Sequence, residues 1–344
     1  MKLKKNQQKV NEKSYFQILM RGIGEEYVNS VQHKSDKYCG GSISNLPMSV
    51  ADLLISGFPL EFMNGETYHM PHVWLNAVFD ALVNKLGDKR VYVISIMGIQ
   101  SSGKSTLLNT MFGINFKVGG GSCTKGVFAQ LISVDGLLAN DLGYEYILLL
   151  DTEGLRAPEI GNTKCLHYEK IAALVITMAD IIIVNIKGEN TSEIEEILQI
   201  SVHASVQMHS LKQNIKPPLG CYFVHQNVSD LNASEKMRFA YANIQKQLDE
   251  ITITAAKKMG VSEIQSFNDV IDFDMNKQIL YFPNLWKGDP PMAPVNPSYS
   301  EKAIGLKTQI LNNPSEKNIY CLTFSDLKNC VSRLQKAILD KNIV

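Results

Sequence analysis

The sequence has no excess charge of either sign, no long apolar run and no paired cysteines. Lysine plus arginine and aspartate plus glutamate each number 34, so no net field attracts nucleic acid or an acidic membrane surface. No apolar run reaches the roughly 20 residues of a membrane span. The first residues, MKLKKNQQK, are charged but lack the apolar segment of a signal peptide. These absences predict a cytoplasmic chain with no transmembrane segment and no nucleic-acid partner.

The cysteines also give no sign of a disulfide framework or a metal site. The six cysteines are scattered, and none forms a C-x-x-C pair or metal-ligand spacing with the seven histidines. We interpret them as reduced thiols of a cytosolic protein. What the sequence does contain is apolar material, because 45% of its 344 residues are hydrophobic. That content is enough for a sizeable core in one large domain or two ordinary ones.

A phosphate-binding loop is the clearest motif. Residues 98–105, GIQSSGKS, fit the pattern G-x-x-x-x-G-K-[ST], between an apolar strand at 91–96 and the opening of a helix at 105–112. In that order, backbone N–H groups close around phosphate oxygens and the helix N-terminus adds its positive dipole end. We expect Lys104 to reach the β- and γ-phosphates and the Ser105 hydroxyl to bind Mg²⁺. The predicted nucleotide contacts in this region are Gly98, Ser101, Ser102, Gly103, Lys104, Ser105 and Thr106.

A second motif, DTEG at residues 151–154, follows the apolar strand at 146–150. This is the D-x-x-G position of a second phosphate and Mg²⁺ site, where we expect the carboxylate of Asp151 to hold Mg²⁺ and the N–H of Gly154 to face the γ-phosphate. The alternative is a simple Asp/Gly turn. Its place after an apolar strand and downstream of a phosphate loop favours the metal site.

Between these motifs lies a glycine-rich segment, VGGGSCTKG, at residues 118–126. Consecutive glycines predict a segment that orders only when the γ-phosphate and Mg²⁺ are present. Thr124 is the natural second hydroxyl ligand of the metal. A plain glycine loop is the alternative.

The base is expected to be read after a later strand. Asn227 and Asp230 give an N-x-x-D arrangement, in which Val228 takes the place of the usual lysine. An aspartate accepts two N–H bonds from guanine, so the predicted nucleotides are GTP and GDP. The alternative is that Asp230 caps the helix that begins near residue 233.

The sequence lacks an obvious hydrolytic residue. Many small GTPases place a glutamine directly after D-x-x-G, whereas this chain has Leu155 there. The nearest polar candidates lie inside the phosphate loop, and Arg156 is the nearest cation. The residues expected to take part in hydrolysis are Gln100, Ser101, Lys104, Thr124 and Arg156. A GTP-binding switch or scaffold with negligible hydrolysis stays open as the alternative.

The order of elements predicts a doubly wound α/β domain with a mostly parallel central sheet and added N- and C-terminal helices. The expected organisation is a polar leader over 1–45, a helical extension over 46–90 that packs on the following domain, a GTPase domain over 91–290, and a C-terminal loop and helices over 291–344. The last helix has no obvious cap, which suggests that the chain continues into a longer protein. The expected strands are 91–96, 128–134, 146–150, 181–186, 222–225 and 279–282.

The same motifs resemble a known family. The loop GIQSSGKS is similar to the G-x-Q-S-x-G-K-S loop of dynamin-superfamily GTPases, and TKG and DTEGL resemble segments of guanylate-binding proteins and atlastins. The longer segments SCTKGVF and DTEGLRAPE are similar to switches I and II of the very large interferon-inducible GTPases. HQNV, LLISGFPLE and PMAPVNPSYS also resemble segments of that family, so the resemblance covers most of residues 46–344.

The resemblance implies a Mg²⁺-dependent GTPase domain of a very long, multidomain, cytosolic or nuclear protein linked to interferon-induced defence. It also implies a homodimer that forms through the GTPase domains. Guanylate-binding proteins carry a catalytic arginine where this chain has Ser101, whereas dynamins use a serine and the glutamine before it. The resemblance therefore favours the route through Gln100 and Ser101.

Overall fold

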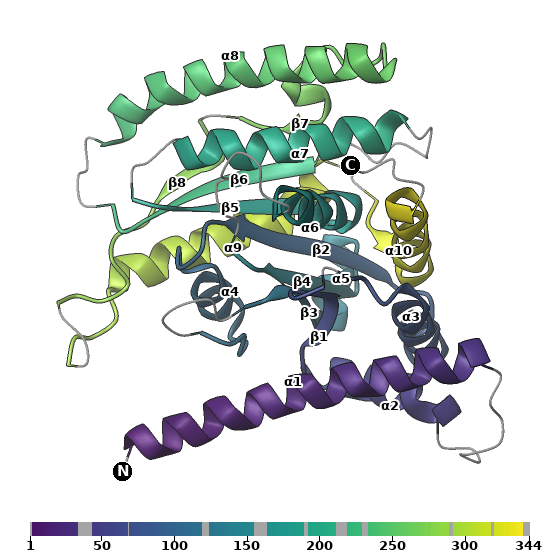
Figure 1. Cartoon of the computed structure of the whole chain (residues 1–344). Helices are drawn as coiled ribbons and strands as arrows, with labels where there is room; N and C mark the ends of the chain where they lie inside the picture. The colour runs from purple at the N-terminus through teal and green to yellow at the C-terminus, as the bar shows by residue number, and fades with distance from the viewer. Residues whose placement is uncertain are drawn as a thin grey trace.

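A central sheet organises the chain (Figure 1). The computed structural model describes residues 2–33, 43–67, 69–118, 124–154, 164–188, 192–210, 219–228, 233–274, 276–288, 292–317 and 320–339. The sheet has nine strands in the order β1-β3-β4-β2-β5-β6-β7, and β8 pairs with β6 and β9 with β2. The strands are β1 Leu60–Asn64, β2 Arg90–Gly98, β3 Gly126–Ser133, β4 Tyr146–Thr152, β5 Ile181–Lys187, β6 Leu219–Gln226, β7 Ile271–Asp272, β8 Ile279–Tyr281 and β9 Leu322–Thr323.

Helices cover both faces of this sheet. The α-helices are α1 Lys2–His33, α2 Leu46–Ile55, α3 His72–Leu86, α4 Lys104–Phe112, α5 Gly136–Leu142, α6 Lys164–Met178, α7 Ser192–Ser210, α8 Ala233–Met259, α9 Pro297–Lys317 and α10 Phe324–Leu339. Short 3₁₀ helices lie at Ile43–Asn45 and Phe267–Asp269. None of the described helices is long and apolar enough to cross a membrane.

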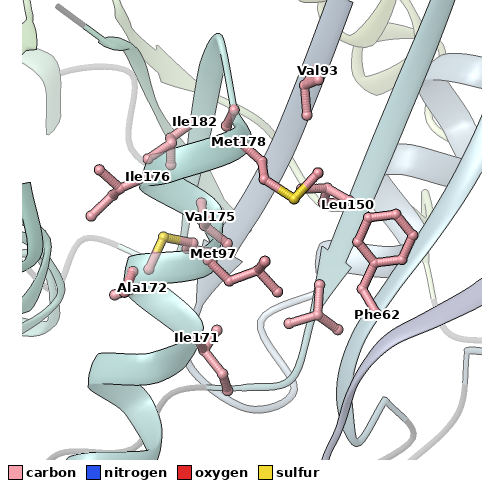
Figure 2. Close-up of a cluster of buried hydrophobic side chains, with 14 of the residues drawn as sticks. Phe62, Val93, Met97, Leu150, Ile171, Ala172, Val175, Ile176, Met178 and Ile182 are labelled. Carbon is pink, nitrogen blue, oxygen red and sulfur yellow. The ribbon is translucent and has the colours of Figure 1, made fainter. Parts of the chain in front are cut away.

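The strand alternation divides the core in two. On β2, Val93 and Met97 join the larger cluster, whereas Ile94 joins the smaller one on the opposite face. Figure 2 shows the larger cluster, in which α6 lays Ile171 and Val175 against the sheet. Helices α4 and α9 cover the other face, and α9 is tied down by the Tyr92 hydroxyl, which donates to its carbonyl at Ile310 over 3.0 Å. A strand that is apolar on both faces explains the continuous apolar runs of the sequence.

The predicted fold class is confirmed. Strands β2, β4, β5, β6, β7 and β8 pair in parallel, and the antiparallel pairs are β1–β3, β3–β4 and β2–β9. Each of the six expected strands is present with its ends shifted by a few residues. The expected domain boundaries stay predictions, and the sheet takes β1 and β9 from outside residues 91–290.

The structure also contains elements that the sequence pattern did not predict. Strand β1 lies between the two expected helices of residues 46–90 and pairs antiparallel with β3, from Leu60 opposite Ala129 to Asn64 opposite Gly126. Helix α1 spans most of the residues expected as a polar leader, and its Arg21 pairs with Glu61 on β1 at 2.6 Å. These elements place the segment 124–126 next to the N-terminal part of the chain.

Candidate functional site

The phosphate loop connects the end of β2 to the start of α4. Gly98 has φ 153°, and a Cβ there would collide with the backbone carbonyl of Asn185 on β5. Ser101 is exposed and has φ 61°, a left-handed conformation that is rare for a residue with a side chain. Gly103 caps α4 with φ 91°. Such strained backbone concentrates where a loop is shaped for a ligand rather than for stability.

Lys104 is buried behind this loop. Its Nζ donates to the backbone carbonyls of Gly98 at 3.1 Å and Ile99 at 2.9 Å, and the residue is 6% exposed. Burial lowers the pKa of Lys104 to about 8, against the opposing effect of the carboxylates of Asp151 and Glu153. A desolvated ammonium group beside a glycine loop attracts an anion strongly, because little water competes for it.

The predicted metal ligands meet at one point. The Ser105 hydroxyl donates to Asp151 Oδ2 at 2.6 Å, the Thr124 hydroxyl donates to the same oxygen at 3.1 Å, and the hydroxyl oxygens lie 3.3 Å apart. The structure therefore brings together residues that are separated along the chain by the phosphate loop helix and by β3. Thr124 reaches this point because Gly126 begins β3, directly opposite β4.

The second oxygen of Asp151 gives a test of metal binding. Asp151 is 1% exposed, and its Oδ1 has no hydrogen-bond partner among the residues that the structure describes. Burial raises the pKa of Asp151 to about 6, opposed by the bonds from Ser105 and Thr124 and by the charge of Lys104. A buried carboxylate oxygen without a donor is costly unless a ligand satisfies it. Hydroxyl and carboxylate oxygens are the ligands that Mg²⁺ prefers, so these residues fit the metal.

Gly154 packs directly against the phosphate loop. A Cβ at Gly154 would collide with the backbone of Gln100, so glycine is required for the approach of the two motifs. Its predecessor Glu153 is 7% exposed and accepts the backbone N–H of Gly126 at 2.7 Å. The N–H of Glu153 in turn donates to the carbonyl of Gly126 at 2.7 Å. These two hydrogen bonds of Glu153 hold Gly126, two residues after Thr124, next to the motif that contains Asp151.

Sequence reasoning assigned no role to Glu153 or to Asn185. Glu153 lies inside a recognised motif, so its position carried a signal. Asn185 interrupts the apolar run of β5, where it is fully buried. A polar side chain in a run otherwise suited to a central strand is the available signal, because such a group needs a hydrogen-bond partner inside the fold.

The base-binding residues are only partly described. Asn227 follows β6 with φ 59°, and the next N–H, of Val228, donates to the Phe282 carbonyl at 2.9 Å. Asp230 and Arg156 lie outside the described residues, as does Leu155. Thr106 is half-buried in the first turn of α4. The predicted roles of these residues stay predictions.

His225 holds the base side of the sheet together. Its Nδ1 lies 2.8 Å from the Gly188 carbonyl, its Nε2 lies 2.6 Å from the Tyr241 hydroxyl of α8, and its ring stacks on Tyr281 of β8. The Nδ1–H tautomer satisfies both contacts, since it donates to the carbonyl and accepts from the hydroxyl. Burial lowers the pKa of His225 to about 4.

We therefore expect acid to destabilise this region through His225. Between pH 6.5 and about 4 the unfolded chain binds a proton that the folded chain does not, so stability falls as pH falls. The shift corresponds to up to about 3 kcal/mol. Denaturant unfolding from pH 7 to 4 should show a shallower pH slope for His225→Phe than for the parent. His203→Gln, at an exposed position on α7, is the matched control for the removal of a histidine.

Comparison with known proteins identifies the family of this chain. The model of the URGCP-like GTPase domain family matches residues 2–300. The chain is 42% identical over 327 residues to mouse interferon-induced very large GTPase 1, and 40% identical over 329 residues to the human protein of that name. It is 33% identical over 279 residues to bovine up-regulator of cell proliferation. The matches cover 95%, 95% and 78% of this chain, but 13%, 13% and 29% of those relatives.

Among solved structures, the chain is similar to a dimerization-deficient mutant of Toc33 from Arabidopsis thaliana. That match has a TM-score of 0.38 and 12% identity, and it covers 77% of this chain and 99% of the other. The family assignment rests instead on the family model, which spans most of the chain, together with the phosphate loop and the Asp151 motif. The chain belongs to the family of URGCP-like GTPase domains.

Proposed function

We propose that this domain binds Mg²⁺·GTP and hydrolyses it to GDP and phosphate. The observation that carries the proposal is the convergence of Ser105 and Thr124 on one oxygen of Asp151, whose other oxygen is buried with no donor from the described residues. Bound there, Mg²⁺ neutralises charge on the phosphate oxygens. The phosphate loop contributes N–H groups, and Lys104 contributes a buried positive charge.

Hydrolysis in this proposal depends on the phosphate loop and on self-association. Gln100 lies against Gly154, and Ser101 is the exposed residue at the loop tip. We propose that both residues act on the γ-phosphate and that Arg156 is the cation. Since the chain has leucine in place of the usual water-orienting glutamine, we propose that turnover is slow in the monomer and faster in a homodimer formed by the GTPase domains.

We propose that the site is specific for guanine nucleotides through Asn227 and Asp230. Competition of ATP against bound GTP tests this, and Asp230→Asn is the matched variant. Equal affinity of the parent for ATP and GTP would remove the guanine assignment. Two relatives have names that describe them as interferon-induced, so we propose an interferon-linked role for this chain, which corresponds to 13% of each of them. The proposed cytoplasmic or nuclear location rests on the family resemblance of the sequence motifs.

The decisive measurement is GTP hydrolysis against protein concentration, with oligomer mass recorded in the same samples. We expect the turnover per molecule to rise as the protein associates and to vanish when Mg²⁺ is chelated. A turnover that stays flat with concentration would contradict the role of self-association. GTP that is bound but uncleaved after hours would instead support a nucleotide-dependent switch.

A further inference from the structure

A buried amide on the neighbouring strand supports the phosphate loop from behind. Asn185, near the end of β5, is completely buried, and its Nδ2 donates to the backbone carbonyl of Ser102 at 2.7 Å and to the Ser102 hydroxyl at 3.2 Å. The Ser102 hydroxyl donates its own proton to the carbonyl of Ile99 at 3.0 Å. Asn185 is therefore bonded to the loop but lies on the side away from solvent.

A second buried amide fixes the orientation of the first. Gln226, at the end of β6, is 4% exposed, and its Nε2 donates to Asn185 Oδ1 at 3.0 Å. The Gln226 side chain is also hydrogen-bonded to the hydroxyl of Tyr299 on α9. With its oxygen engaged by Gln226, the amide of Asn185 presents its nitrogen to Ser102 and not the reverse. The parallel pairing of β5 with β6 sets this arrangement, since Asn185 and Gln226 both lie at the carboxyl ends of these strands.

The chemistry of an anion-binding loop requires such donors. When backbone N–H groups converge on a phosphate, the neighbouring carbonyls turn away from it, and a buried carbonyl needs a donor of its own. Lys104 Nζ serves the carbonyls of Gly98 and Ile99, and Asn185 serves that of Ser102. The close approach of Gly98 to the backbone of Asn185 brings the same strand against the start of the loop.

We propose that Asn185 is a positioning residue for the nucleotide phosphates, and that Gln226 orients it. Asn185 acts through the Ser102 peptide and does not touch the nucleotide. This inference rests on the proposed function of the loop in binding GTP. It assigns a role in ligand affinity to two amides outside the nucleotide-binding motifs.

The test measures nucleotide affinity in Asn185→Leu, which keeps the side-chain volume and removes the donor. We expect GTP and GDP to bind about 10-fold or more weakly, because a buried carbonyl loses its donor and the loop relaxes. KM for GTP should rise while kcat stays within about twofold. Gln226→Leu should lower nucleotide affinity by a smaller factor. The double variant should bind no more weakly than Asn185→Leu alone, because Gln226 acts only through its hydrogen bond to Asn185.

A matched control separates positioning from stability. Ile186 lies next to Asn185 on β5, is fully buried, and belongs to the core on the opposite face of the sheet. Ile186→Ala should lower the unfolding temperature and leave nucleotide affinity unchanged below it. Asn185→Ala repeats the test if leucine impairs folding.

The outcomes distinguish the positioning role from the proposed function. A parent that binds GTP together with an Asn185→Leu variant that binds within twofold of it would overturn the positioning role alone. An equal loss of affinity in Ile186→Ala would overturn it as well. A parent that binds neither GTP nor GDP would overturn the proposed function, and the positioning role with it.

Discussion

Lys104→Met is expected to weaken GTP binding by about 100-fold or more, with no loss of stability in the nucleotide-free protein. The affinity falls because charge-assisted hydrogen bonds to phosphate contribute roughly 1.5–3 kcal/mol each, and a desolvated ammonium group forms more than one of them. The stability is kept because the buried charge of Lys104 already destabilises the folded state, and the substitution removes that charge. The pKa of Lys104 is lowered to about 8 by burial, so the charged form is less favourable inside the protein than in water.

The two effects are measured separately. Titration with a fluorescent GTP analogue gives the affinity, and thermal unfolding without nucleotide gives the stability. Methionine fills the volume of the lysine stem and removes the cost of the buried charge, whereas the carbonyls of Gly98 and Ile99 lose their donor. These two effects oppose each other, so the expected unfolding temperature stays within a few degrees of the parent's. Lys85→Met is the control, because Lys85 pairs with the exposed Asp52 on the protein surface. It should change neither quantity appreciably.

A large fall in the unfolding temperature of Lys104→Met would contradict this account. It would mean that Lys104 is required to hold the loop in shape, and that its loss removes affinity only by collapsing the loop. Unchanged GTP affinity would remove Lys104 from the binding site altogether.

Local patterns were enough to predict that Ser105, Thr124 and Asp151 belong together, whereas their roles toward phosphate and metal stay predictions. The loop sequence fixes where β2 ends and α4 begins, and the apolar runs of β2, β4 and β5 require burial on both faces. Parallel strands end at the same edge of a sheet, so Ser105 and Asp151 had to lie close together. Thr124 joined them because a switch threonine follows the glycine-rich segment, and its hydroxyl contacts both.

Elements that depend on pairing across the fold were not predictable in the same way. Strand β1 has five residues and a burial pattern without regular alternation, so it is stable only because β3 offers an edge. Helix α9 begins at Pro297, directly after a proline-rich segment whose sequence predicts irregular backbone. The start of this helix follows from its packing on α4 and not from a local sequence pattern. Asn185 likewise has no motif, and its role follows from its distance to Ser102.

Asp151→Asn is expected to remove the dependence of GTP binding on Mg²⁺ and to slow hydrolysis by about 100-fold or more. The substitution conserves volume but removes the charge and one of the two acceptor oxygens. The hydroxyls of Ser105 and Thr124 both donate to Oδ2, so an asparagine that keeps an oxygen at that place preserves the local structure. What is lost is the carboxylate oxygen Oδ1, a buried acceptor for which the described part of the chain offers no donor. Metal charge contributes several kcal/mol to stabilising a phosphoryl-transfer transition state, which sets the expected scale.

The unfolding temperature provides the matching readout. Burial raises the pKa of Asp151 to about 6, so the carboxylate form is destabilised by the fold at neutral pH, and Asp151→Asn should unfold at the parent's temperature or higher in the absence of ligand. Addition of Mg²⁺ and GTP should stabilise the parent more than the variant, because the stabilisation by a ligand rises with the logarithm of its concentration divided by Kd. Asp135→Asn is the control, since Asp135 caps α5 at a distance from the site, and it should leave the Mg²⁺ response intact. If Asp151→Asn retained the parent's full Mg²⁺ response, the metal would have to bind away from the Ser105–Thr124 pair, and the buried oxygen of Asp151 would need another ligand.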